Sequence, residues 1–282
     1  MPYDLKQITA KTLVSRVDYH DQIGSTNDCG IALAIQDPAQ TPLLVLADRQ
    51  TAGRGRGSNQ WWSANGALTF SLVVDAGLVG LATSRFPLVS LSAGLATARV
   101  LSTELECLRS SAVDPQTHQH LGSASSGESG PSDVGLKWPN DVHLRGRKVC
   151  GILVETAPQR SGVLVVGVGL NINNSFQTAP APLRTTGISL REVSGRLHDP
   201  TELLISLLNE FERDLRLLAA NRLDLVSCWQ QYCLLRGRTV QLECGKQQFS
   251  GVCQGIDDDG ALVLQRGEDV QRFFAGVVRH VR

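Results

Sequence analysis

Two apolar runs near the middle of the chain most restrict its fold. KVCGILVE covers residues 148–155 and GVLVVGVGLNI covers residues 162–172, with a tight link near residues 158–161. Short continuous apolar runs that are rich in β-forming residues predict buried strands. LLVLA at residues 43–47 and GALTFSLVV at residues 66–74 follow the same pattern. The chain is therefore expected to place at least four strands in its core.

Helical patterns alternate with these strands. Leucines with one alanine, Ala98, recur at steps of three and four over residues 88–108, and leucines with one phenylalanine do so over residues 204–218. This spacing gives each helix one apolar face, which is expected to pack on the core. A shorter helix is expected to begin at Ser25 or Thr26, because either hydroxyl can cap it.

The C-terminal part has a different character from about residue 236 onward. Short β-rich pieces alternate with turn signals, at residues 238–243, 248–256, 261–265 and 271–274. Short strands joined by tight turns predict a small antiparallel barrel. A chain of 282 residues has room for one large and one small domain. We therefore expect a large domain over residues 1–234 and a small barrel over residues 235–282.

Residues 109–133 form a low-complexity segment. Twelve of these 25 residues are Ser, Gly or Pro, and few are apolar. Such a segment cannot bury enough surface to offset the entropy of ordering it. We expect a mobile surface excursion that the fold does not need. His118 and His120 lie in it as an H-x-H pair, and this setting argues against a metal site there.

Charge and cysteine content exclude several classes of protein. Lys+Arg and Asp+Glu number 27 each, and this balance argues against binding nucleic acid or anionic membranes through bulk electrostatics. The chain has no run of 18 apolar residues and no pattern of a secretory signal. Its seven cysteines are odd in number and lack a C-x-x-C pair, which fits neither a disulfide framework nor a zinc finger. A reducing cytoplasm is the simple interpretation.

Two segments in the first quarter of the chain suggest ligand binding. Residues 24–27 read GSTN at a helix start, where free amides and polar side chains can bind an uncharged group such as an amide or urea. An ordinary helix cap is the alternative. Residues 50–57 read QTAGRGRG, with glycines that admit a ligand and with Arg54 and Arg56 to bind phosphate or carboxylate. A flexible basic loop is the alternative, and Trp61 can serve simple packing.

Two later segments add cations and amides. Residues 137–141 read KWPND and Lys148 follows, so that lysines can neutralise phosphates while Asn140 and Asp141 offer oxygen ligands to Mg²⁺. A plain turn between strands is the alternative. Residues 167–174 read GVGLNINN, in which Asn171 can read an adenine edge or a phosphate. A strand that ends in asparagine-rich turn chemistry is the alternative.

Together and in this order, these segments closely resemble the biotin–protein ligases of the BirA type. The resemblance rests on GSTN at 24–27, QTAGRGR at 50–56, KWPND at 137–141, RKVCGILVE at 147–155 and GVGLN at 167–171. It implies an α+β fold like that of class II aminoacyl-tRNA synthetases, with a mixed, mainly antiparallel sheet, flanking helices and a C-terminal SH3-like barrel. It also implies that the chain activates biotin with ATP, forms biotinyl-5′-adenylate, and transfers biotin to one lysine of a biotin carboxyl carrier domain.

The resemblance also implies roles for individual residues. Biotin would be bound by Ser25, Thr26, Asn27, Gln50, Arg54, Gly55, Arg56, Lys148 and Gly151. ATP or the adenylate would be bound by Arg54, Arg56, Trp61, Lys137, Asn140, Asp141, Lys148 and Asn171. Lys148, Arg54 and Lys137 would be the catalytic residues, and Mg²⁺ would lie near Asn140 and Asp141. The loop would close over the mixed anhydride to exclude water.

Two departures from the family pattern stand out. The family's Gly-Arg loop usually continues with a second Gly-Arg step, but residues 57–60 here read GSNQ, so one expected cation is missing and the adenylate is expected to be held less firmly. The segment at 109–133 is an insertion of unknown role. Only 23 residues precede Gly24, so we expect no winged helix-turn-helix domain and no DNA binding. A homodimer is possible.

Two alternatives to biotin ligation remain at this stage. A lipoate or octanoate ligase or transferase of the same fold is the nearer one, and the C-terminal barrel with the GRGR and KWPND motifs favours biotin over it. A nucleic-acid-binding regulator that uses Arg54 and Arg56 is the more distant one, and the zero net charge disfavours it.

Overall fold

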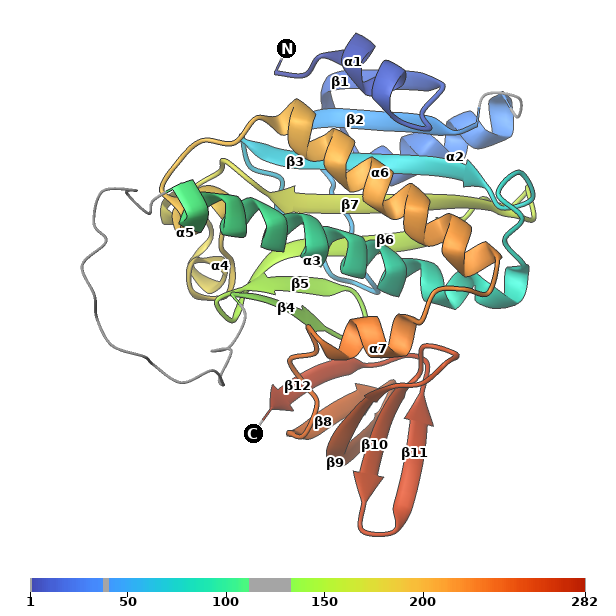
Figure 1. The fold of residues 1–282 in the computed structure, drawn as a ribbon, viewed down its shortest axis with the longest axis vertical. Coiled ribbons are helices and arrows are strands. Elements are labelled where there is room, and N and C mark those ends of the chain that lie inside the picture. Colours follow the sequence, from blue (N-terminus) through green and yellow to red (C-terminus); the bar gives the residue numbers. More distant parts are fainter. Residues whose placement is uncertain (1, 38–40, 112–132, 282) are drawn as a thin grey trace.

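The computed structural model describes residues 2–37, 41–111 and 133–281. These residues form a large sheet with covering helices and a small second sheet (Figure 1). The helices are α1 Leu5–Lys11, α2 Thr26–Gln36, α3 Phe86–Ser111, α4 Ala181–Thr186, α5 Leu190–Ser194, α6 Pro200–Ala219 and α7 Leu225–Gln230. Short 3-10 turns span Thr83–Arg85 and Phe176–Thr178.

The large sheet has seven strands in the order β1-β2-β3-β7-β6-β5-β4. The strands are β1 Arg16–Ile23, β2 Leu43–Gln50, β3 Ala67–Asp75, β4 Val134–Lys137, β5 Asp141–Leu144, β6 Arg147–Thr156 and β7 Val163–Asn171. Among these strands β1 and β2 run parallel, and the other neighbours run antiparallel. This confirms the expected mixed, mainly antiparallel sheet.

The centre of the sheet explains why its strands read as continuous apolar runs. β3 and β7 pair over nine residues, and all nine residues of β7 are buried. Leu72 and Val166 lie in the core that faces α3 and α6, whereas Val73 and Val165 lie in the core on the opposite face. Successive side chains point to opposite faces, so both faces of these strands need apolar residues.

Helices cover both faces of the large sheet. α3 and α6 contact each other and lie side by side across one face (Figure 1). α2 contacts β2, β3 and β7 on the other face. The predicted helix start is confirmed, because Ser25 is the N-cap of α2 and its hydroxyl accepts the Asp28 N–H. The two long helices match the predicted leucine patterns.

Some elements were not predicted from the sequence. β1 has a polar sequence because it is an edge strand, and β4 and β5 have only four residues each. The low-complexity segment was expected to begin at residue 109, which is wrong: residues 109–111 are the last turn of α3, and Arg109 pairs with Asp133 at 2.6 Å. Residues 112–132, including His118 and His120, lie outside the described residues.

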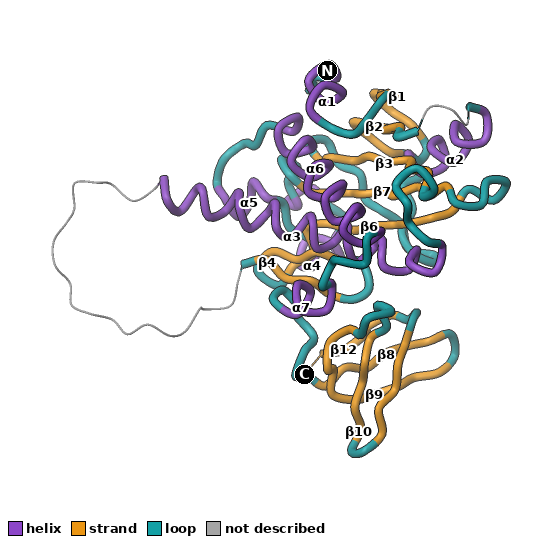
Figure 2. The backbone as a smooth tube through the Cα atoms, turned by 45° about the vertical axis from the view of Figure 1, so that its right-hand side comes forward, coloured by secondary structure: helices purple, strands orange, loops and turns teal. Residues whose placement is uncertain are grey.

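The small sheet follows α7 and has five antiparallel strands in the order β11-β10-β9-β8-β12. They are β8 Thr239–Cys244, β9 Gln247–Ile256, β10 Leu262–Arg266, β11 Asp269–Phe273 and β12 Val277–Val281. The first four match the four predicted pieces. The last, β12, was not predicted, although three of the five residues in its sequence VVRHV are valine. Figure 2 shows this unit beside the β4–β5 end of the large sheet.

The small sheet is anchored to the larger part by specific contacts. The indole Nε1 of Trp138, at the end of β4, donates to the Gly260 carbonyl at 3.1 Å. A Cβ at Gly260 would lie 2.7 Å from side-chain atoms of Leu88 and Leu91 on α3, so only glycine allows this close approach. These contacts hold the small sheet beside the KWPND turn, at residues 137–141.

None of the helices among the described residues combines the length and apolar character needed to cross a membrane. The seven cysteines all lie among the described residues, and none of them forms a disulfide.

Candidate active site

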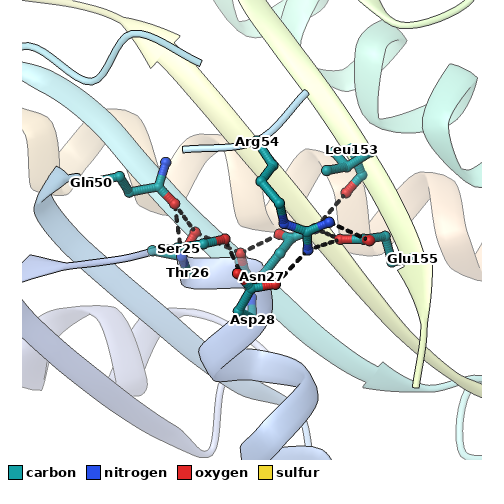
Figure 3. Close-up of polar contacts among 9 residues, drawn as sticks. Ser25, Thr26, Asn27, Asp28, Gln50, Arg54, Leu153 and Glu155 are labelled. Carbon is teal, nitrogen blue, oxygen red and sulfur yellow. Dashed lines mark hydrogen bonds and ion pairs between the residues drawn. The ribbon is translucent and has the colours of Figure 1, made fainter. Parts of the chain in front are cut away.

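The first turn of α2 and the end of β2 form a hydrogen-bonded cluster. The backbone N–H and the hydroxyl of Thr26 both donate to Oε1 of Gln50, at 2.7 and 3.1 Å (Figure 3). Ser25 and Thr26 are each only 3% exposed. Ser25 caps the helix and also lines the cavity described below, so the helix cap is confirmed and the role in ligand binding stays a prediction.

Asn27 is held between three strands. Its Nδ2 donates to Glu155 Oε2 at 2.8 Å and to the Leu153 carbonyl at 3.2 Å (Figure 3). The Ser71 hydroxyl lies 2.6 Å from Asn27 Oδ1 and 2.8 Å from Thr26 Oγ1, so it can donate to either oxygen. These contacts fix the orientation of the Asn27 amide. A Cβ at Gly167 would overlap Oδ1 of Asn27, which explains the first glycine of the GVGLN motif.

The Gly-Arg loop forms a closed turn over this cluster. The Trp61 N–H donates to the Gly53 carbonyl at 2.9 Å and the Gly55 N–H donates to the Asn59 carbonyl at 2.8 Å. Arg54 makes a bidentate contact with Glu155, at 2.9 and 2.7 Å, and pairs with Asp28 at 2.6 Å (Figure 3). The hydrogen bonds to Glu155 are the main cause that raises the pKa of Arg54. Arg54 thus faces two carboxylates, neither of which was predicted as its partner.

Trp61 covers the floor of the cavity. A Cβ at Gly169 would overlap its indole ring, and a Cβ at Gly151 would lie 3.4 Å from the same ring. The two glycines therefore make a flat surface on β6 and β7 that accepts an aromatic ring. Among the described residues, the indole Nε1 has no hydrogen-bond partner although it is buried.

Cations gather at the other end of the cavity. Lys148 Nζ lies 2.5 Å from Asp141 Oδ1, and Lys137 and Arg56 also line this end. Burial lowers the pKa of Lys137, with Lys148 and Arg279 adding to the effect and Asp141 opposing it. Burial likewise lowers the pKa of Arg56 against the opposing charge of Asp141. One carboxylate thus faces several cations, and this end is suited to an anionic ligand.

The contacts of Asn140 and Asp141 do not fit a dedicated Mg²⁺ site. The Asn140 amide donates to the Ile152 carbonyl at 2.5 Å, and the Ile152 N–H donates back to the Asn140 carbonyl at 3.1 Å. These bonds give Asn140 a structural role in holding the turn against β6. The carboxylate of Asp141 is paired with Lys148. A Mg²⁺ ion prefers several free oxygen ligands, which these two residues do not supply together.

The small sheet closes one side of the cavity. Glu243 of β8 and Arg279 of β12 pair at 2.8 Å, and both line the cavity, as do residues 276–278. Arg279 contributes a positive charge near Lys137. The sequence analysis assigned no site residue to this unit, because a small barrel carries no motif of its own.

Most of these groups line one cavity of about 770 Å³, whereas Asp28, Ser71 and Glu155 contact residues that line it without lining it themselves. Thirteen of the fourteen predicted site residues line it: Ser25, Thr26, Asn27, Gln50, Arg54, Gly55, Arg56, Trp61, Lys137, Asn140, Asp141, Lys148 and Gly151. Asn171 does not, because it is 3% exposed and its Oδ1 accepts from Asn174 at 3.0 Å. This supports the alternative of a strand that ends in a polar turn.

Other groups near the cavity were not predicted. Thr69 on β3 lines it and is 2% exposed, and its Oγ1 has no hydrogen-bond partner among the described residues. Ser71 and Glu155 complete the network around Asn27. Thr69 and Ser71 are polar residues at alternate positions of the otherwise apolar run GALTFSLVV. This spacing could have predicted two polar side chains on one face of the strand.

Comparisons with known proteins agree with this geometry. Residues 19–173 match the sequence model of the biotin/lipoate A/B protein ligase family, and residues 236–281 match that of the biotin protein ligase C-terminal domain. The biotin–[acetyl-CoA-carboxylase] ligase of Mycobacterium tuberculosis is 31% identical, over 95% of this chain and 90% of that protein. The bifunctional ligase/repressor BirA of Bacillus subtilis is 27% identical, over 91% of this chain and 71% of that protein. The biotin protein ligase of Aquifex aeolicus, solved with biotin and ATP, has the same fold with a TM-score of 0.73 and 22% identity, over 95% of this chain and 99% of that one.

Proposed function

The chain belongs to the biotin/lipoate A/B protein ligase family, and on that premise we propose how its cavity acts. It is an ATP-dependent biotin–protein ligase, of the biotin–[acetyl-CoA-carboxylase] type named among its relatives. Its substrates are biotin and ATP, and we propose a biotin carboxyl carrier protein as its third substrate.

One observation carries the choice of substrate: the cavity has a polar end, where the charge of Arg54 is paired with Glu155 and Asp28, and a cationic end. Hydroxyls and amides of Ser25, Thr26 and Gln50 supply uncharged hydrogen-bonding groups at the polar end. They lie beside the hydroxyl of Thr69, which has no hydrogen-bond partner among the described residues. A ureido group offers both N–H donors and a carbonyl acceptor, so it can satisfy such groups. Octanoate and lipoate carry no such group at their far end, and would leave these polar groups unpaired at a cost.

The cationic end would serve the reacting groups. In the first step an oxygen of the biotin carboxylate attacks the α-phosphorus of ATP, a P–O bond forms, and the bond to pyrophosphate breaks. Lys148 and Lys137 would stabilise the charge on the phosphate oxygens, and Arg56 would add a third cation. Alignment and charge stabilisation suffice here, and no covalent enzyme intermediate is needed.

In the second step the lysine amine of the carrier attacks the acyl carbonyl of biotinyl-5′-adenylate. An amide bond forms, AMP leaves, and the amine loses its proton. The loop at residues 53–61 lies where it would shield the anhydride from water, and Arg54 anchors that loop to Glu155. The weaker retention expected from the missing second Gly-Arg step stays a prediction.

We further propose that the ligase works in a reducing compartment, the cytoplasm, because none of its seven cysteines forms a disulfide. The absence of DNA binding and a possible homodimer also stay predictions, as do the domain limits at residues 234 and 235.

Competition on one carrier domain tests this proposal. The full chain is mixed with ATP, a biotin carboxyl carrier domain and equal concentrations of biotin and lipoate, and the carrier is analysed by intact mass. Addition of the biotinyl group alone is expected, and substitution of the carrier's acceptor lysine by arginine should abolish it. Predominant addition of the lipoyl group would contradict the proposal.

A further inference from the structure

Three side chains that can bind a metal lie outside the cavity, between the edge strand β1 and α2. Asp18 and His20 are two residues apart on β1, so they point to the same face of the sheet. Cys29 lies in α2, which covers that face. Asp18 Oδ2, His20 Nε2 and Cys29 Sγ all lie within 4.8 Å of one another. None of the three lines the cavity described above.

The distances between these atoms lie within 0.4 Å of those of a tetrahedral metal site. His20 Nε2 lies 2.9 Å from Asp18 Oδ2, and Cys29 Sγ lies 3.5 Å from Asp18 Oδ2 and 3.9 Å from His20 Nε2. A tetrahedral zinc ion with bonds of about 2.0–2.3 Å holds its ligand atoms about 3.3–3.6 Å apart. Small side-chain rotations are enough to bring each pair into that range.

The donor set and its exposure favour zinc. A thiolate and an imidazole select Zn²⁺ over Mg²⁺ or Ca²⁺, which prefer oxygen ligands. The charges of the Asp18 carboxylate and a Cys29 thiolate would balance those of the ion. The side chains of His20 and Asp18 are 32% and 26% exposed, so an ion can reach them from solvent. Three protein ligands leave the fourth position to water.

We propose that Asp18, His20 and Cys29 bind a zinc ion that ties the edge strand β1 to α2. In the structure the Cys29 thiol donates a hydrogen bond to Oδ2 of Asp18. Burial, with the charge of Asp18, raises the pKa of Cys29 to about 11, so the thiol carries its proton at neutral pH. Binding forms a Zn–S bond and releases that proton to solvent. This inference goes beyond the proposed function, and neither depends on the other.

Cobalt spectroscopy on the untagged full chain tests the proposal. Co²⁺ is titrated into wild type, Cys29→Ser, His20→Ala and the control Cys107→Ser, which removes an exposed cysteine on α3. Wild type and the control are expected to bind one Co²⁺ with a thiolate-to-cobalt charge-transfer band, which Zn²⁺ then removes by displacement. Cys29→Ser should lose the band, and His20→Ala should weaken Zn²⁺ binding at least about tenfold.

A second measurement guards against a variant that fails to fold. Unfolding temperatures are recorded with and without Zn²⁺, because an ion that binds only the folded state raises them. Zn²⁺ should raise the unfolding temperature of wild type and Cys107→Ser, but not that of Asp18→Asn or Cys29→Ser. Absence of a thiolate band in wild type, or its persistence in Cys29→Ser, would overturn the proposal.

Discussion

Substitution of Gly167 by alanine tests the architecture of the polar end of the cavity, which Asn27 lines. The new methyl group would overlap Oδ1 of Asn27 and lie 2.8 Å from its Cγ. Asn27 is 5% exposed and holds contacts to Ser71, Leu153 and Glu155, so it cannot move without losing some of them. A buried polar group left without a partner costs about 1–3 kcal/mol.

That cost sets the size of the expected effect. If Asn27 leaves its position in the complex with biotin, 1–3 kcal/mol corresponds to a roughly five- to 150-fold weaker affinity, at about 1.4 kcal/mol per factor of ten. The affinity for biotin is measured by isothermal titration calorimetry, and unfolding temperature is recorded in parallel. Gly24→Ala is the matched control, because a Cβ at Gly24 would meet nothing within 4 Å. We expect the control to bind biotin within about twofold of wild type, since changes away from such contacts cost little. Wild-type affinity in Gly167→Ala would refute the reasoning.

Three further substitutions test other parts of the site. Lys148→Ala removes a cation from the reacting end and should slow adenylate formation at least about 100-fold in single-turnover measurements, whereas Lys6→Ala on the exposed side of α1 should not. Burial lowers the pKa of Lys137 below its ordinary value of 10.5, so this lysine loses its charge at a lower pH than an exposed lysine does. KM for ATP should therefore rise as the pH approaches 10.5. It should rise less in Lys137→Arg, because a guanidinium stays charged at that pH. Glu155→Gln removes the bidentate ion pair of Arg54 and leaves only its pair with Asp28. Arg54 is 39% exposed, so stability should fall by less than about 1 kcal/mol, yet trypsin should cut after Arg54 several times faster. An unchanged cleavage rate would mean that the pair with Glu155 does not anchor the loop.

The sequence predicted the central strands and the two long helices because their patterns come from burial on the sheet. β7 is apolar throughout because both of its faces are covered, and α6 carries its leucines on the side that meets the sheet. β1 escaped prediction because an edge strand needs no such pattern, and its polar residues Asp18 and His20 gave no strand signal.

The residues of the site could be predicted where they belong to a sequence motif. Contacts that depend on how distant segments pack together could not be predicted. The resemblance to biotin–protein ligases identified the side chains that meet in the cavity. It did not indicate that Arg54 would face Glu155 and Asp28, since both contacts join separate segments of the chain, and Glu155 lies 101 positions from Arg54. The role of Arg279 likewise depends on how the small sheet packs, and no local pattern records this.

The Asn171 prediction was not supported for a related reason. A GVGLN run indicates a glycine-lined strand end, and both glycines do make room for other groups, Asn27 at Gly167 and Trp61 at Gly169. The asparagine that follows is used instead to close the turn with Asn174. Sequence spacing alone does not distinguish a ligand contact from a turn contact at such a position.

The central claim is that one cavity activates biotin with ATP, and exchange of labelled pyrophosphate into ATP tests it most directly because no carrier is needed. The full chain is assayed with biotin, with lipoate, with octanoate, and with no acid added. We predict exchange that depends on biotin and is lost in Lys148→Ala. Exchange supported by lipoate or octanoate but not by biotin would contradict the account.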